Sequence, residues 1–128
     1  MANGAAARPA AYDRLTGILA EVVSLQHVGS VLFWDQQVMM PKGGAEARGS
    51  QMAALRKVTH EKFTSPEIGN LLGELGDYEG SLHFDSDEAS TIRVARREYE
   101  KASKVSPDLV VRLSQAGTAG FKAWLEAR

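Results

Sequence analysis

Residues 31–48 read VLFWDQQVMMPKGGAEAR, and this stretch decides how the chain divides into helices. It joins an apolar run that ends at Trp34 to a Met40-Pro41 pair and then to two glycines. Proline disfavours helical backbone at the residue before it, and the glycine pair extends the interruption. The stretch therefore predicts that one helix ends before Pro41 and that another begins at about Ala45.

Upstream of this break, apolar residues recur at the three- and four-residue spacing of an amphipathic helix. They are Tyr12, Leu15, Ile18, Leu19, Val22 and Leu25. The pattern predicts a first helix over about residues 10–27. Gly29 leaves two alternatives for the segment that follows, which either continues this helix or begins a second one. Residues 1–9, rich in alanine and containing Gly4 and Pro9, are expected to form a flexible tail.

Downstream of the break, two Ser-Pro pairs are typical helix starts. Ser65-Pro66 and Ser106-Pro107 each place a capping residue before a proline at the first helical position. The spacing of apolar residues predicts helices over 45–63, from 66 to about 76, over 86–104 and from 107 onward, with an acidic loop over 76–87. Since no alternating strand pattern occurs, we expect an all-α fold of five or six helices in a single domain over residues 10–128.

Composition narrows the function classes. The chain has 128 residues, a net charge of −1 and no cysteine. The charge argues against nucleic-acid binding, and Glu98 and Glu100 interrupt the basic residues of the 86–104 helix, where Glu100 is expected to pair with Arg96 and Lys104. No N-terminal apolar segment or 18-residue apolar run is present, so we expect a cytoplasmic protein without a membrane partner.

Residues for metal chemistry are sparse. The histidines are His27, His60 and His83, and no spacing rule joins the first or the last to His60. His60-Glu61 resembles the start of a His-Glu-x-x-His zinc helix, but Thr64 occupies the position of the second histidine. We therefore expect no catalytic residue, no metal site and no bound cofactor in this chain.

Asp35 is the carboxylate that invites two interpretations. It could lie at a groove edge and contact a substrate or a cationic partner, or it could pair with Arg48 while Trp34 anchors the core. The structural interpretation is favoured because lone carboxylates rarely carry chemistry and buried charges are usually paired. It predicts that Trp34 and Trp124 are more than half buried and that the Met39-Met40 pair packs against the core.

The chain resembles the N-terminal part of the carboxypeptidase Taq family of zinc metallocarboxypeptidases. The resemblance rests on a signature of Trp34, Asp35, Gln36, Met40, Pro41 and Arg48. Weaker blocks follow in family order: Tyr12-x-x-Leu15, His60-Glu61, the Arg-Arg-Glu-Tyr-Glu-Lys run at 96–101, residues 104–110 and Trp124-x-x-Ala127-Arg128. The signature residues are candidates for a groove or a structural motif.

The resemblance implies a cytoplasmic, mostly helical enzyme that removes residues from peptide C-termini. Its zinc is expected to be held by two histidines and a glutamate, and its N-terminal helices to form a wall or lid of the substrate groove. None of those ligands, nor the catalytic glutamate, maps onto this sequence, so zinc is expected only in a full-length relative. The chain itself is then expected to be inactive alone.

Two functions from different classes remain. The first is a peptidase fragment whose partner is a missing C-terminal catalytic part, an interpretation favoured because the last helical pattern reaches Arg128 without a cap. The second is a self-sufficient helical module that binds another protein or forms a homodimer. Phe121 and Leu125 are the candidate interface residues, since they are expected on a different stripe from Leu109, Leu113 and Trp124.

Overall fold

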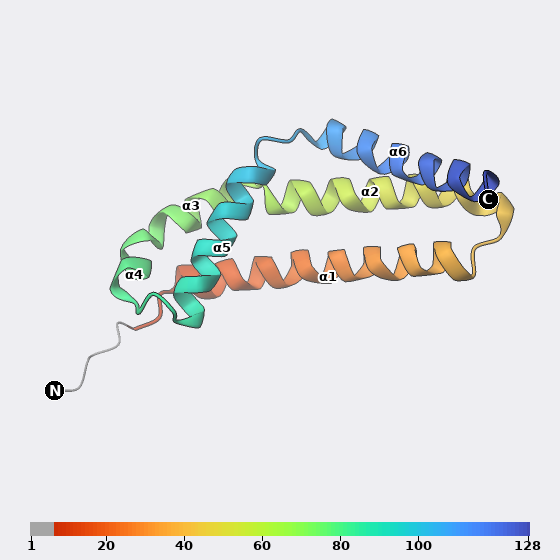
Figure 1. Ribbon diagram of the computed structural model, residues 1–128. Coiled ribbons are helices and arrows are strands. Elements are labelled where there is room, and N and C mark those ends of the chain that lie inside the picture. Colours follow the sequence, from red (N-terminus) through yellow and green to blue (C-terminus); the bar gives the residue numbers. More distant parts are fainter. Residues whose placement is uncertain (1–6) are drawn as a thin grey trace. The chain divides into compact units, whose positions relative to one another are not determined.

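The computed structural model describes residues 7–128, and within them every regular element is a helix (Figure 1). The helices are α1 (Ala10–Val38), the 3-10 turn η1 (Lys42–Gly44), α2 (Ala45–Phe63), α3 (Pro66–Glu74), α4 (Gly76–Ser81), α5 (Asp87–Ala102) and α6 (Pro107–Glu126). The predicted all-α fold is therefore confirmed. Most of the predicted N-terminal tail, residues 1–6, lies outside the described residues.

The helix boundaries follow the sequence signals with two differences. α1 runs through Gly29 as one helix of 29 residues and ends at Val38, before the Met-Pro pair. A short helix, α4, occupies part of the segment predicted to be a loop. Asp77 and Glu79 stand in its first turn, where carboxylates interact favourably with the helix dipole, so an acidic segment is compatible with a helix start.

The chain clusters into two compact units. Unit 1 combines the N-terminal segment up to Glu21 with residues 63–104, and unit 2 combines residues 22–62 with residues 105–128. α1 therefore contributes its first turns to one unit and the rest to the other. The single domain over residues 10–128 stays a prediction.

Unit 1 has an aliphatic core formed by the start of α1, α3 and α5. The side chains of Leu15, Ile68, Leu75 and Ile92 are fully buried there. Tyr99 of α5 packs edge-on against Phe63, with 6.5 Å between ring centroids. Its hydroxyl would lie 2.6 Å from a Cβ atom added at Gly69, so α3 and α5 approach closely because residue 69 has no side chain.

Unit 2 contains the α1–α2 hairpin and α6, which runs back along α2 (Figure 1). Two glycines of unit 2 face neighbouring helices. A Cβ atom at Gly29 would lie 3.6 Å from Leu55, and one at Gly49 would lie 3.3 Å from Thr118. At the other end of α2, the Nε2 atom of His60 lies 2.8 Å from the carbonyl oxygen of Val105, which ties the segment before α6 to α2.

Candidate functional site

The side chains of the signature Trp34-Asp35-Gln36 point in three different directions from α1. Trp34 is 59% exposed, Asp35 faces α2, and Gln36 is only 8% exposed. Successive helical residues point about 100° apart, so adjacent side chains do not share one face. The prediction that Trp34 and Trp124 are more than half buried is wrong, since Trp124 is also 52% exposed. On α1, the buried face belongs to Gln36 and Val22 instead.

The methionine pair does not pack against the core as predicted. α1 ends at Val38, so Met39 lies in the turn and is 67% exposed. Met40 lies beside the 3-10 turn, where its Cγ atom is 3.0 Å from the position of a Cβ atom at Gly44. Both side chains therefore belong to the connection between α1 and α2.

Arg48 joins α2 to the end of α1. Its Nη2 atom lies 2.6 Å from Oδ2 of Asp35, and its Nη1 atom donates to the carbonyl oxygen of Leu32 at 2.8 Å. Its Nε atom donates to Gln51 at 3.1 Å, and its side chain is 15% exposed. Every guanidinium nitrogen has a partner within unit 2. These contacts support the structural interpretation of Asp35 and Arg48.

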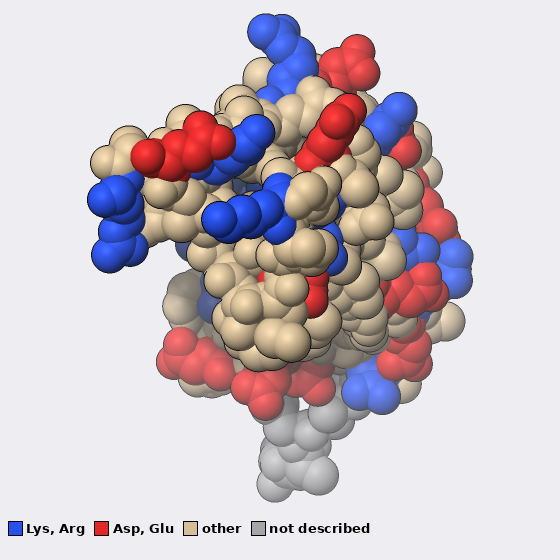
Figure 2. Space-filling model, turned by 90° about the vertical axis from the view of Figure 1, so that its right-hand side faces the viewer, with Lys and Arg blue, Asp and Glu red and all other residues tan. Residues whose placement is uncertain are grey.

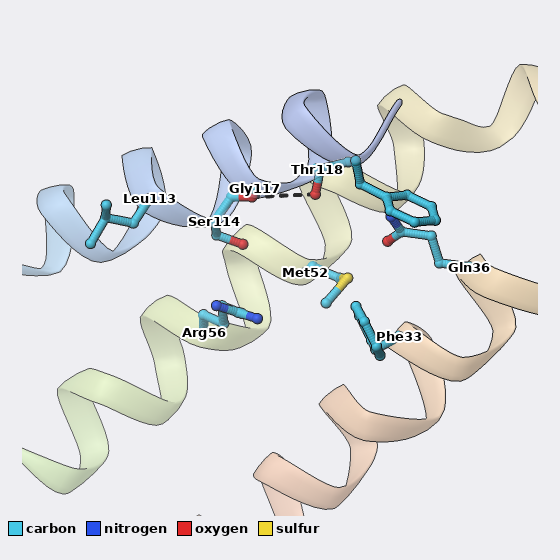
Figure 3. A pocket seen from close by; sticks show the side chains of 9 residues that line it. Phe33, Gln36, Met52, Arg56, Leu113, Ser114, Gly117 and Thr118 are labelled. Atoms are coloured by element: carbon cyan, nitrogen blue, oxygen red, sulfur yellow. Dashed lines mark hydrogen bonds between the residues drawn. The ribbon is translucent and has the colours of Figure 1, made fainter. Parts of the chain in front are cut away.

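A hollow of unit 2 lies among α1, α2 and α6 (Figure 3). It encloses about 140 Å³. Its lining residues are Phe33, Gln36, Met52, Arg56, Leu113, Ser114, Gly117, Thr118 and Phe121. Sequence reasoning missed most of this set because only the register of three helices brings these residues together.

The last turns of α6 carry an aromatic cluster. The rings of Phe121 and Trp124 stack with 5.9 Å between centroids, and the Arg128 guanidinium lies 4.9 Å from the Trp124 centroid. Phe121 lines the same hollow as Leu113, so its predicted separation from the stripe of Leu113 and Trp124 is wrong. Residues three or four apart on a helix are neighbours, which places Phe121 beside Trp124. Leu125 is exposed, as an interface candidate must be.

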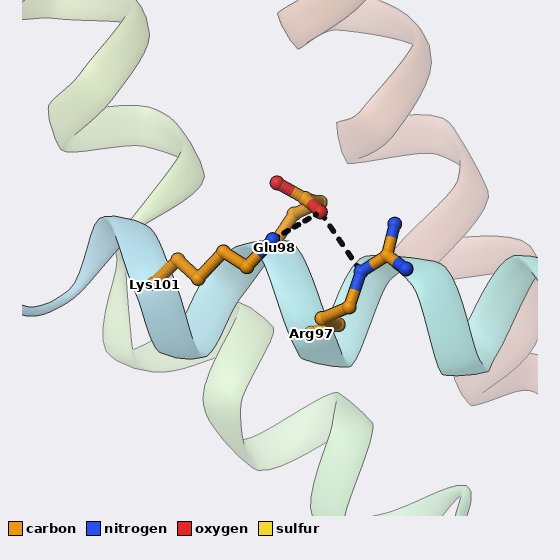
Figure 4. Close-up of polar contacts among 3 residues, drawn as sticks. All are labelled: Arg97, Glu98 and Lys101. Atoms are coloured by element: carbon orange, nitrogen blue, oxygen red, sulfur yellow. Dashed lines mark hydrogen bonds and ion pairs between the residues drawn. The ribbon is translucent and has the colours of Figure 1, made fainter.

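The charges of α5 are used within unit 1. Glu98 accepts from Arg97 at 3.0 Å and from Lys101 at 3.3 Å (Figure 4). These hydrogen bonds, from Arg97 first, lower the pKa of Glu98, so any stability they contribute is lost as the pH falls through that pKa. The ion pair of Arg96 is with Glu79 of α4 at 3.0 Å, not with Glu100 as predicted. Figure 2 shows acidic and basic side chains interspersed on the face it displays.

In unit 2, these features define packed helices with a structural ion pair between Asp35 and Arg48 and a partly apolar hollow. A family-wide sequence profile of carboxypeptidase Taq (M32) metallopeptidases matches residues 14–128. The chain belongs to this family.

Two curated relatives are both called thermostable carboxypeptidase 1. The protein of Thermus thermophilus is 40% identical over 122 residues, which are 93% of this chain and 23% of the relative. The protein of Pyrococcus furiosus is 30% identical over 105 residues, 82% of this chain and 20% of the relative. The chain thus spans about a fifth of the length of these relatives. No solved structure matches it.

The residues present do not fit the metal centre that the family implies. Among residues 7–128, no group of three or more His, Asp or Glu side chains is placed to hold a metal ion. His60 is engaged with Val105 through Nε2, and Thr64 stands where a second histidine would be needed. His83 Nδ1 accepts from the backbone of Asp85 at 3.2 Å.

Proposed function

We propose that this chain serves as a helical wall or lid of the peptide groove in a zinc metallocarboxypeptidase, and that it releases no amino acids by itself. The family match over residues 14–128 carries the proposal. The chain corresponds to about a fifth of each relative, and its described residues offer no ligand set for zinc. We infer that a metal-dependent activity uses residues beyond those of this segment.

The apolar surface of α1 supports a packing role. One face of the helix carries Leu15, Ile18 and Val22, which are buried within their units. The other carries an exposed stripe, defined here as Val23, Val31, Trp34 and Val38. A helix with apolar residues on both faces is typical of one covered on both sides. We infer that the exposed stripe packs against the remainder of a full-length family protein.

The first test uses the 128-residue chain alone. We expect no release of C-terminal amino acids from a test peptide and no zinc retained after dialysis, measured by chromatography and elemental analysis. Catalytic zinc sites use three protein ligands and an open position. One zinc per chain together with peptidase activity would overturn the proposal.

The wall role is tested in a chimera. The matching segment of the Thermus thermophilus relative is replaced by this chain, and the product is assayed for carboxypeptidase activity. We expect an active chimera that loses activity when Val31→Asp and Trp34→Asp are introduced together. Val94→Asp is the control, because Val94 is an exposed apolar residue of α5 outside the stripe. Full activity in the stripe variant would contradict the proposal.

The exposed apolar residues of α6 favour a second candidate, a homodimer. Leu113, Trp124 and Leu125 are each more than half exposed. We propose that α6 contributes to a contact between two copies, and that a cytoplasmic location accompanies either function.

A further inference from the structure

One buried hydrogen-bond acceptor in unit 2 has no donor. Gln36 is 8% exposed, and its Oε1 atom is buried with no hydrogen-bond partner in the described part of the chain. Figure 3 shows its side chain extending from α1 toward α6, into the hollow. Most buried polar side-chain atoms in proteins have a partner, so an unpaired one requires an explanation. A ligand that donates a hydrogen bond to Oε1 would explain it.

The lining residues and the size of the hollow favour a ligand that contains an apolar ring. Phe33 and Phe121 contribute aromatic rings from two helices, and Met52 contributes a thioether between them. Thioether sulfur makes favourable contacts with ring edges. The volume of about 140 Å³ is close to the roughly 150 Å³ of an engineered apolar cavity that binds benzene. The hollow is therefore the right size for a single ring.

Arg56 gives the hollow a cation at its other end. It lies one turn beyond Met52 on α2, about 5 Å further along the helix axis. The Gly29–Leu55 contact puts it near the level of Gly29, away from Gln36 and the inter-helix turn. Within the described residues it has no ion pair or side-chain hydrogen bond. An exposed guanidinium beside an apolar hollow is suited to a carboxylate, which it binds with two parallel hydrogen bonds.

We propose that the hollow among α1, α2 and α6 binds a small aromatic carboxylic acid with a hydroxyl group on the far side of its ring. The ring lies between Phe33 and Phe121, the hydroxyl donates to Oε1 of Gln36, and the carboxylate pairs with Arg56. The three groups match the two polar ends and the apolar middle of the hollow. The site is independent of the peptidase proposal, because all of its residues belong to unit 2 of this chain.

The test titrates the 128-residue chain with 4-hydroxyphenylacetate. It follows the Met52 methyl signal by NMR and the fluorescence of the two tryptophans, of which Trp124 stacks on Phe121. We expect saturable binding. Phenylacetate, which lacks the donor, should bind about two- to tenfold more weakly because one hydrogen bond is lost. 4-Methylphenol, which lacks the carboxylate, should bind about fivefold more weakly or worse, because it loses the paired hydrogen bonds to Arg56.

Three variants distinguish binding at this site from non-specific binding. Arg56→Gln should weaken the acid about fivefold or more, while the neighbouring Lys57→Gln, whose lysine does not line the hollow, should not. Gly117→Leu should abolish binding by filling the hollow, and it should fold because an added Cβ meets no atom within 4 Å. Circular dichroism checks the fold of each variant. Absence of saturable binding, which would leave water as the partner of Gln36, or binding unaffected by Gly117→Leu, would overturn the proposal.

Discussion

At the scale of single residues, the unpaired amide oxygen of Gln36 leads to a prediction about stability. Replacing it by methionine keeps the volume and removes the buried acceptor, so the free energy of unfolding should rise by about 1 kcal/mol. Urea denaturation measures the change, and Gln37→Met at an exposed neighbouring position serves as the control with little effect. A clear loss of stability would show that ordered water already satisfies the oxygen.

Alanine substitutions at two glycines of α3 are expected to change the stability of the chain in opposite directions. At Gly69 an added methyl group would collide with the Tyr99 hydroxyl, and the ring has little freedom because it packs on Phe63. Gly69→Ala should therefore destabilise the chain by about 1–3 kcal/mol. At exposed Gly73 nothing lies within 4 Å, so Gly73→Ala should stabilise by up to about 1 kcal/mol through helix propensity. Thermal unfolding of both variants tests the pair, and equal shifts would contradict the close approach of α3 and α5.

At the scale of elements, Arg48 fastens α1 to α2. Arg48→Met should lower the free energy of unfolding by about 1–3 kcal/mol, because it leaves the partly buried Asp35 without its cation and removes the bond to Leu32. Arg56→Met on the same helix removes the same charge without breaking a described pair, and should change stability by less than about 0.5 kcal/mol. Chemical denaturation compares the two. Similar losses in both variants would mean that the clamp adds nothing specific.

Helix starts were the most predictable part of the fold because their chemistry is local. Ser106 accepts from the backbone nitrogen of Leu109 at 3.2 Å, as its position before Pro107 predicted. α3 begins at Pro66 as predicted, but Ser65 makes no side-chain cap hydrogen bond. The ion pair between Asp35 and Arg48 was also accessible, since only a short turn separates the two helices.

The exposure of Trp34 was not predictable, because α1 has apolar residues on both faces and periodicity does not say which face is covered. For the same reason, the hollow lined by Gln36, Met52 and Phe121 could not be predicted. It depends on the register of three helices, in which Gly29 faces Leu55 and Gly49 faces Thr118. Local sequence signals do not encode such a register.

At the scale of the whole molecule, the length and composition of α1 are relevant to the prediction that the chain has no membrane partner. The sequence has no uninterrupted run of 18 apolar residues, yet α1 is long and apolar enough to cross a membrane by length and composition. One such helix is weak evidence, because the core helix of a soluble protein meets the same criteria. One face of α1, with Leu15, Ile18 and Val22, is buried, while 17% of the apolar window as a whole is buried inside the structure. The absence of a membrane partner stays a prediction.

The uncovered apolar residues also predict self-association of the isolated chain. If 400 Å² of apolar surface per chain is buried between two copies, the gain is roughly 10 kcal/mol at about 25 cal/mol per Å². The cost of association is estimated at about 4–15 kcal/mol, so the two terms are close and a weak dimer is the expected result. A two-fold contact through α6 is the simplest arrangement, with Trp124 and Leu125 contributing.

Light scattering across a dilution series measures this association. The wild-type chain should shift from dimer to monomer on dilution, and Leu125→Asp should move that transition to higher concentration because it places a charge in the apolar contact. Val94→Asp adds the same charge on α5 and should leave the transition unchanged. If the wild-type chain is monomeric at every concentration and binds no dye specific for apolar surface, the isolated chain covers these residues itself. In that case neither the dimer nor the need for a covering partner would stand.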